Sequence, residues 1–134
     1  ISFMKDFKLL SEKEKELCFQ AADLINSQIA IPCTACHYCV SHCPMGLDIP
    51  YLLACYNDYK FSMSAMSSMR LDGLDDDKKP AACVQCGQCA HACPQGIDVP
   101  KVLAELADLY ANGPKWADAA KGRQAAIRKD LNME

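Results

Sequence analysis

The chain contains 134 residues, 51% of them hydrophobic, with a formal net charge of -3 and a pI near 5.6. This length gives a single domain a modest core, the apolar content argues against intrinsic disorder, and the acidic balance without a lysine and arginine cluster excludes nucleic acid as the expected partner. No apolar run approaches the roughly 18 residues of a membrane span and no segment resembles a signal peptide, so we expect a cytoplasmic protein with no membrane partner.

Residues 1–30 are predicted to form a lead-in segment and a first helix. The opening stretch, "ISFMKDFKLLSEKEKE", reads like the interior of a polypeptide, so we expect the chain to be the C-terminal piece of a longer protein. Ser11 and Glu14 have the spacing of a capping box, which marks a helix start. The expected apolar face of this helix comprises Leu17, Ala21, Leu24, Ile25 and Ile29.

An internal repeat relates residues 31–60 to residues 81–111. A shift of 50 positions aligns the two segments without a gap, which indicates two copies of one structural unit. The residues shared by both copies are Cys33 and Cys83, Cys36 and Cys86, Cys39 and Cys89, Cys43 and Cys93, Pro44 and Pro94, Gly46 and Gly96, Asp48 and Asp98, Pro50 and Pro100, Leu53 and Leu103, and Ala54 and Ala104.

Each copy is predicted to be a cysteine loop followed by a helix. Asp48 and Asp98 are suited to be N-cap residues, and Pro50 and Pro100 suit a first helical turn, where a missing N–H costs nothing. The glycine after each Cys-Pro pair can take a positive φ and turn the chain into the helix. The apolar positions then recur helically at Leu52, Cys55, Tyr56 and Tyr59 in the first copy and at Val102, Leu106, Leu109 and Tyr110 in the second.

The remaining segments complete a mostly helical, all-α fold. "FSMSAMSSMR" is weakly helical, and its Met63, Met66 and Met69 are expected to fill the core. "LDGLDDDKKP" is predicted to be a solvated, charged loop that ends at Pro80. Residues 112–134 should form a last helix from about Pro114 to Leu131, with an apolar side of Trp116, Ala120, Ile127 and Leu131. No alternating run is long enough to predict a strand.

The motif CxxCxxCxxxCP, present once in each repeat, carries the chemistry. Ten cysteines in a chain without an export signal favour metal or cluster ligation over disulfides. A CxxCxxC loop offers three thiolates to one cubane 4Fe-4S cluster, and in the two-cluster ferredoxin pattern the cysteine before the proline serves the other motif's cluster. We therefore predict one ligand set of Cys33, Cys36, Cys39 and Cys93, and a second of Cys83, Cys86, Cys89 and Cys43. Each cluster would then join the two repeats, and the apoprotein should be poorly ordered.

Zinc remains an alternative occupant, because it also accepts four thiolates and can replace clusters in protein purified in air. Zinc sites usually pair two CxxC knuckles and require neither the third cysteine of the run nor a crossed partner, which favours clusters. Cys18 and Cys55 are expected to be small buried hydrophobes. His37, His42 and His91 are surplus as ligands and are expected to be loop residues with at most an indirect effect on cluster potential.

The cysteine motifs resemble those of a known family in their settings, "IPCTACHYCVSHCPMGLDIPYLLACYNDYKF" and "KKPAACVQCGQCAHACPQGIDVP". They are similar to the C-terminal ferredoxin domain of iron-sulfur-containing aldo/keto reductase-like oxidoreductases. The resemblance covers nearly the whole chain and is most specific at residues 31–54 and 78–104. It implies an upstream (β/α)8 barrel for a nicotinamide-dependent carbonyl or alcohol reaction, and such a barrel, of roughly 250 residues, cannot lie in this chain. The spacing of 40 residues between Cys43 and Cys83 is long for a small bacterial ferredoxin and resembles the α-helical ferredoxin arrangement of fumarate reductase and related iron-sulfur subunits.

The function predicted from the sequence is therefore an electron-transfer module with two 4Fe-4S clusters, which exchanges electrons between the parent enzyme and a redox carrier protein or cofactor. The parent would be an oxidoreductase, whereas this segment supplies no catalytic residue. Two alternatives stay open. One is a structural docking domain held together by zinc or clusters without redox turnover, and the other is membership of a different oxidoreductase subunit.

Overall fold

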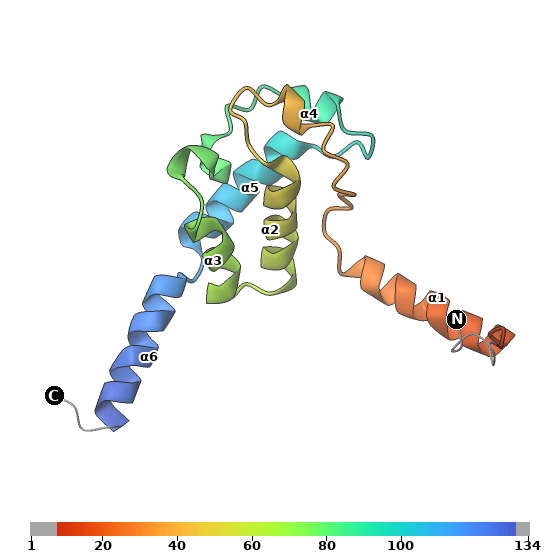
Figure 1. Cartoon of the computed structure of the whole chain (residues 1–134), viewed down its shortest axis with the longest axis horizontal. Coiled ribbons are helices and arrows are strands. Elements are labelled where there is room, and N and C mark those ends of the chain that lie inside the picture. The colour runs from red at the N-terminus through yellow and green to blue at the C-terminus, as the bar shows by residue number, and fades with distance from the viewer. Residues whose placement is uncertain (1–7, 131–134) are drawn as a thin grey trace, which may run out of the picture.

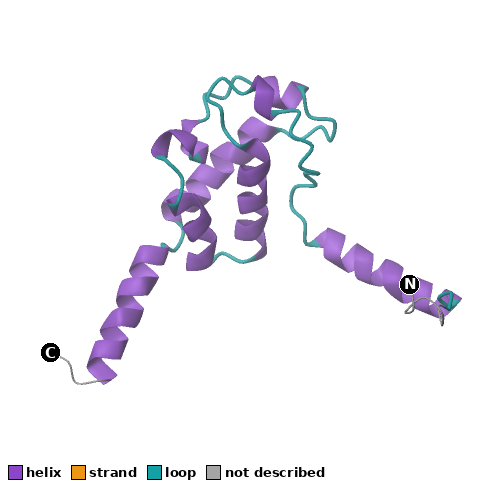
Figure 2. Ribbon diagram, in the orientation of Figure 1, coloured by secondary structure: helices purple, strands orange, loops and turns teal. Residues whose placement is uncertain are grey.

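The computed structural model describes residues 8–130, and its regular elements in this range are all helices (Figure 2). The predicted all-α fold class is thereby confirmed. Five α-helices of at least two turns are joined by one short α-helix, α4, and by 3-10 turns. In chain order the elements are α1 (Glu12–Ser27), η2 (Val40–His42), α2 (Ile49–Phe61), α3 (Ala65–Asp72), η3 (Asp76–Lys78), η4 (Pro80–Ala82), α4 (Gln88–His91), α5 (Val99–Asn112) and α6 (Trp116–Asp130).

Helices α2 and α5 are the second halves of the two repeats, and they start in the same way. The Asp48 carboxylate accepts a hydrogen bond from the Tyr51 N–H at 3.2 Å, and the Asp98 carboxylate accepts one from the Lys101 N–H at 3.4 Å. A proline occupies the first turn of each helix. Both predicted N-caps are confirmed, because a short carboxylate before the first turn satisfies an N–H group that the helix leaves unpaired.

The core lies where α2 and α5 pack against each other below the cysteine loops (Figure 1). Fully burying a leucine or valine side chain stabilises the fold by about 1.5–3 kcal/mol, so this helix pair carries most of the packing energy. The predicted apolar positions of α2 are all buried, and those of α5 are buried or partly buried. The core residues from the two helices and their leading turns are Leu47, Ile49, Leu52, Leu53, Cys55, Tyr56, Tyr59, Ile97, Val99, Val102, Leu103 and Leu106.

Helix α6 is connected to this core through α3. The Ser68 hydroxyl is fully buried, accepts a hydrogen bond from the Trp116 N–H at 2.9 Å, and donates one to the Ala65 carbonyl at 2.9 Å. A serine therefore satisfies the first N–H of α6 from a neighbouring helix, since the unpaired N–H groups of a helix start need partners. The helix starts at Trp116, two residues after the predicted Pro114, and the predicted end at Leu131 lies outside the described residues.

The prediction that Met63, Met66 and Met69 fill the core is wrong. Their exposed fractions are 57%, 56% and 45%. Met63 lies ahead of α3, and this helix of 8 residues buries Ser67, Ser68 and Leu71, which leaves Met66 and Met69 in solvent. The three-residue spacing of the methionines is compatible with a helix. The packed face of α3 is nevertheless formed by its serines, because small side chains let neighbouring helices approach more closely than methionine does.

Helix α1 extends away from the cysteine loops and the α2–α5 pair (Figure 1). Its capping box forms as predicted, with the Ser11 N–H donating to the Glu14 carboxylate at 2.8 Å. Every residue of α1 is exposed, so the apolar face predicted there has no packing partner within the described residues, and the predicted burial of Cys18 is wrong. Similarly, Ile127 on α6 is 51% exposed. No helix within residues 8–130 has the length and apolarity of a membrane span.

Candidate metal centres

Two cavities lie at the end of the molecule that the cysteine loops form. Cavity A is lined by Cys33, Cys36, Cys39 and Cys93, and cavity B is lined by Cys43, Cys83, Cys86 and Cys89. Each cavity thus has three cysteines from one repeat and the cysteine before the proline of the other repeat. The structure brings the eight cysteines together in the two sets that the sequence predicts, although their ligation of clusters stays a prediction.

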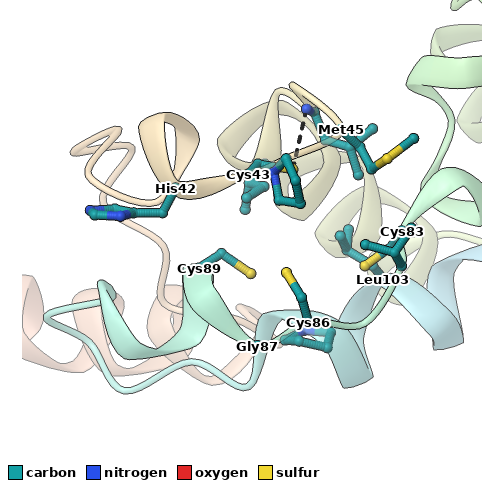
Figure 3. A pocket seen from close by; sticks show the side chains of 13 residues that line it. His42, Cys43, Met45, Cys83, Cys86, Gly87, Cys89 and Leu103 are labelled. Atoms are coloured by element: carbon teal, nitrogen blue, oxygen red, sulfur yellow. Dashed lines mark hydrogen bonds between the residues drawn. The ribbon is translucent and has the colours of Figure 1, made fainter.

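Figure 3 shows the arrangement in cavity B. Cys86 and Cys89 direct their sulfur atoms into the cavity from one side, Cys83 approaches from the end, and Cys43 lies across from them. The Leu47 N–H donates to the Cys43 Sγ at 3.5 Å, which holds the remote cysteine in its turn. A second backbone donor, the Gln85 N–H, lies 3.4 Å from the Cys83 Sγ. Backbone N–H groups aimed at cysteine sulfur stabilise thiolates and are among the levers that set cluster potentials.

The two cavities are lined by equivalent residues of the two repeats. Ile49 of α2 lines cavity B while the next residue along, Pro50, lines cavity A. In the same way, Val99 of α5 lines cavity A while Pro100 lines cavity B. Both cavities therefore share the starts of α2 and α5 as walls, and they lie next to each other.

The loops around the cavities adopt left-handed backbone conformations at equivalent positions. Gly46 and Gly96 have φ of 60° and 65°, which confirms the positive φ predicted there. Three residues with side chains share this conformation, Ala35 at 52°, His37 at 63° and Gln85 at 56°. Each costs roughly 1–2 kcal/mol relative to a right-handed conformation. The loops thus keep a shape that the backbone alone disfavours.

Burial of the third cysteine of each CxxCxxC loop disfavours its free thiolate. Cys39 is 7% exposed, and burial raises the pKa of its thiol to about 11. Burial likewise raises the pKa of the Cys89 thiol. A buried thiolate needs positive charge beside it, and iron supplies that charge in cluster proteins. Cys36 and Cys86 are exposed, so each cavity reaches the surface at the middle cysteine of its loop.

The other residues singled out in the sequence divide between the cavities and the core. His37 lines cavity A and His42 lines cavity B, whereas His91 is exposed and lines neither. Cys55 is fully buried in α2, as predicted, and desolvation raises the pKa of its thiol to about 11. Cys55 is therefore a core residue with an inert thiol.

The donor set fits a multi-iron cluster. Within residues 8–130, no three Cys, His, Asp or Glu side chains converge closely enough to hold a single metal ion. The four thiols of each set instead surround a cavity with mostly apolar walls, such as Leu53 and Ile97 in cavity A and Leu47 and Leu103 in cavity B. Four thiolates around a volume are what a cubane requires, since each iron takes one cysteine at its own corner.

Asn57 is a site residue that the sequence analysis missed. Its side-chain Oδ1 accepts from the Ile31 N–H at 2.8 Å, and its Nδ2 donates to the Ile31 carbonyl at 2.9 Å. The two bonds attach the chain just ahead of Cys33 to α2. A single asparagine, a poor helix former, within an otherwise mostly apolar helix was the available signal. Asn57 has no counterpart in α5, where Ala107 takes its place.

We expect Asn57→Ala to lower the free energy of unfolding of the iron-loaded protein by about 1–3 kcal/mol, because both partly buried polar groups of Ile31 lose their partner. Chemical denaturation followed by circular dichroism measures this change. Asn112→Ala is the matched control, since its amide bonds only to the Asp108 carbonyl in the same helix and is exposed. An equal loss in both variants would show that Asn57 does not hold the cysteine loop.

Comparison with known proteins agrees with the geometry of the two cavities. Residues 32–97 match the family model of the 4Fe-4S dicluster domain, and this range contains all eight cavity cysteines and α2. No curated protein and no solved structure matches the chain. The segment from residue 32 to residue 97 is therefore similar to 4Fe-4S dicluster domains, a similarity that supports iron–sulfur clusters as its cofactor.

Proposed function

We propose that this chain is an electron-transfer module that holds two 4Fe-4S clusters, one in each cavity, with the crossed ligand sets described above. The observation that carries the proposal is the pair of cavities, each framed by four cysteines drawn from both repeats. When bound, such clusters accept and release single electrons. The chain's own residues position the clusters, shield them from water with apolar walls and supply backbone donors to the cysteine sulfurs.

The placement of the cavities suits the passage of electrons through the module. Cavities A and B share the starts of α2 and α5 as walls, so two clusters would lie next to each other. The exposed Cys36 and Cys86 would bring one edge of each cluster to the surface. An electron could then enter at one exposed edge and leave at the other.

The parent protein in this proposal is an aldo/keto reductase-like oxidoreductase whose barrel precedes the chain. This part rests on the resemblance at residues 31–54 and 78–104. The partners would be that barrel and a redox carrier protein or cofactor. The coding sequence immediately upstream tests the proposal: a (β/α)8 barrel there supports it, and a different oxidoreductase subunit would replace it.

The module itself is tested by the content of iron and acid-labile sulfide after anaerobic reconstitution. About eight irons and eight sulfides per chain, with coupled EPR signals after reduction by dithionite, are expected for two cubanes. Zinc without sulfide, or clusters that accept no electron, would favour the second candidate function, a structural docking domain. The exposed apolar residues of α1 and α3, such as Leu24 and Met66, are the observation that favours this alternative.

A further inference from the structure

Lys78 connects the segment between the repeats to the turn that presents Cys43. Its Nζ donates to the Met45 carbonyl at 2.9 Å, although the two residues are 33 positions apart. The same Nζ lies 3.5 Å from the place that a Cβ on Gly46 would occupy. Met45 lines cavity B, so the ammonium is bonded to the wall of that cavity. The lysine was predicted to belong to a solvated charge run, and only the fold reveals this contact.

The second repeat has no equivalent of this contact. Lys78 lies just ahead of the second repeat and contacts the first, so its equivalent lies just ahead of the first repeat, 50 positions earlier. That residue is Gln28, which is exposed and whose side chain bonds to Ser27. In the described structure no side chain bonds to the carbonyl of Gln95, which takes the place of Met45 beside cavity A. Lys101 lines a groove that also includes Gln95, but it makes no side-chain hydrogen bond to that turn among the described residues. The two cavities thus differ in this one fixed cation.

The surroundings make this charge effective. Among the described residues that line cavities A and B, none is Asp, Glu, Lys or Arg. The carboxylates of Asp48 and Asp98 occupy equivalent N-cap positions, so their negative charges act alike on the two cavities. Asp77 lies 3.6 Å from the Lys78 Nζ, but its side chain is 67% exposed against 43% for that of Lys78, so water screens the carboxylate more than the ammonium. Lys79 next along is paired with Asp76 at 2.7 Å.

We propose that Lys78 is a positioning and tuning residue that fixes the turn of Cys43 and makes the cluster in cavity B easier to reduce than it would otherwise be. This inference rests on the proposed function, since it presupposes two reducible clusters. Reduction adds one negative charge to a cluster, and a fixed ammonium bonded to the cavity wall stabilises that charge. The cluster in cavity A receives no such contribution, so Lys78 makes the two clusters unequal.

The test is a redox titration of the reconstituted protein, followed by EPR. Lys78→Met keeps the apolar stem and removes the charge, so it should lower the equilibrium constant for reduction of one cluster about tenfold, which is ~59 mV for one electron. The reduction step of the other cluster, seen as a second wave in the titration, should keep its wild-type potential. The wave that moves should be the same one that Cys43→Ala alters. Lys78→Arg should keep the wild-type value, and Lys101→Met, the matched loss of a lysine beside the other turn, should shift its neighbouring wave less.

A second variant covers the possibility that Lys78→Met does not assemble its clusters. Lys78→Gln keeps a donor for the Met45 carbonyl and removes the charge, so it should assemble fully and still show the lowered wave. Two reversible waves that none of these substitutions moves, or that move equally, would overturn the role of Lys78 and leave the electron-transfer function standing. A reconstituted wild-type protein without any reducible centre would overturn both.

Discussion

Replacing Cys93 by alanine should damage the cluster of the first cysteine loop and leave the cluster of its own repeat complete. Cys93 lines cavity A with Cys33, Cys36 and Cys39, whereas Cys83, Cys86 and Cys89 lie around cavity B. A cubane needs a thiolate on each of its four irons, so cavity A would hold at most three irons firmly. Iron content should fall from about eight to between about four and seven per chain.

Double substitutions identify which cluster is affected. Cys93→Ala with Cys36→Ala removes two ligands of the same cavity, so one complete cluster of about four irons should remain. Cys93→Ala with Cys86→Ala removes one ligand from each cavity, so no complete cubane should remain. The opposite pattern of the two double variants would show that each remote cysteine serves its own repeat. Cys18→Ala is the control that should lose no iron, because Cys18 lies on the exposed helix α1.

Removing the clusters with a chelator under anaerobic conditions should unfold the cysteine loops and weaken the pairing of α2 with α5. Three non-glycine residues, Ala35, His37 and Gln85, hold left-handed backbone in these loops at roughly 1–2 kcal/mol each. With the crossed ligand sets proposed above, each cluster would join the two repeats, so its binding energy would be part of the folding energy. We expect the cooperative thermal transition to be lost and amide exchange in residues 31–47 and 81–97 to accelerate to near unfolded rates.

Helix α1 is the internal control for this experiment. All of its residues are exposed, so its amide exchange should be the same with and without clusters. An apoprotein that keeps a cooperative transition at the same temperature would show that the helix pair folds without its clusters. Full recovery of protection with zinc alone would instead support the structural docking domain.

The repeat explains why so much of the candidate site could be predicted. Matching N-cap, proline and glycine residues fix the same local conformation twice, because Asp48 and Asp98 satisfy helix starts and Gly46 and Gly96 accept a positive φ. These rules act over a few residues and need no knowledge of the rest of the chain. The crossed grouping of the cysteines was predictable as well, because in the two-cluster ferredoxin pattern the cysteine before the proline serves the other motif's cluster.

Wrong predictions fall where burial depends on distant partners. The periodicity of α1 predicts an apolar face, yet Leu17 and Leu24 are 55% and 66% exposed because no described element packs against them. Met66 is exposed for a different reason. Helix α3 does have a packed face, but Ser67 and Ser68 lie on it and Met66 does not. Sequence periodicity shows that a helix has an apolar side, but it carries no information about whether another element covers that side.

The sequence by itself determined the helical class, the two repeats, the helix starts and the identity of the eight cavity cysteines, because capping, turn chemistry and motif spacing are local properties. The tertiary structure alone decided which contacts tie the loops to the helices. Asn57 reaches Ile31 across 26 positions and Lys78 reaches Met45 across 33. Such contacts depend on how α2, α5 and the connecting segment are placed in space, and no local rule encodes that placement.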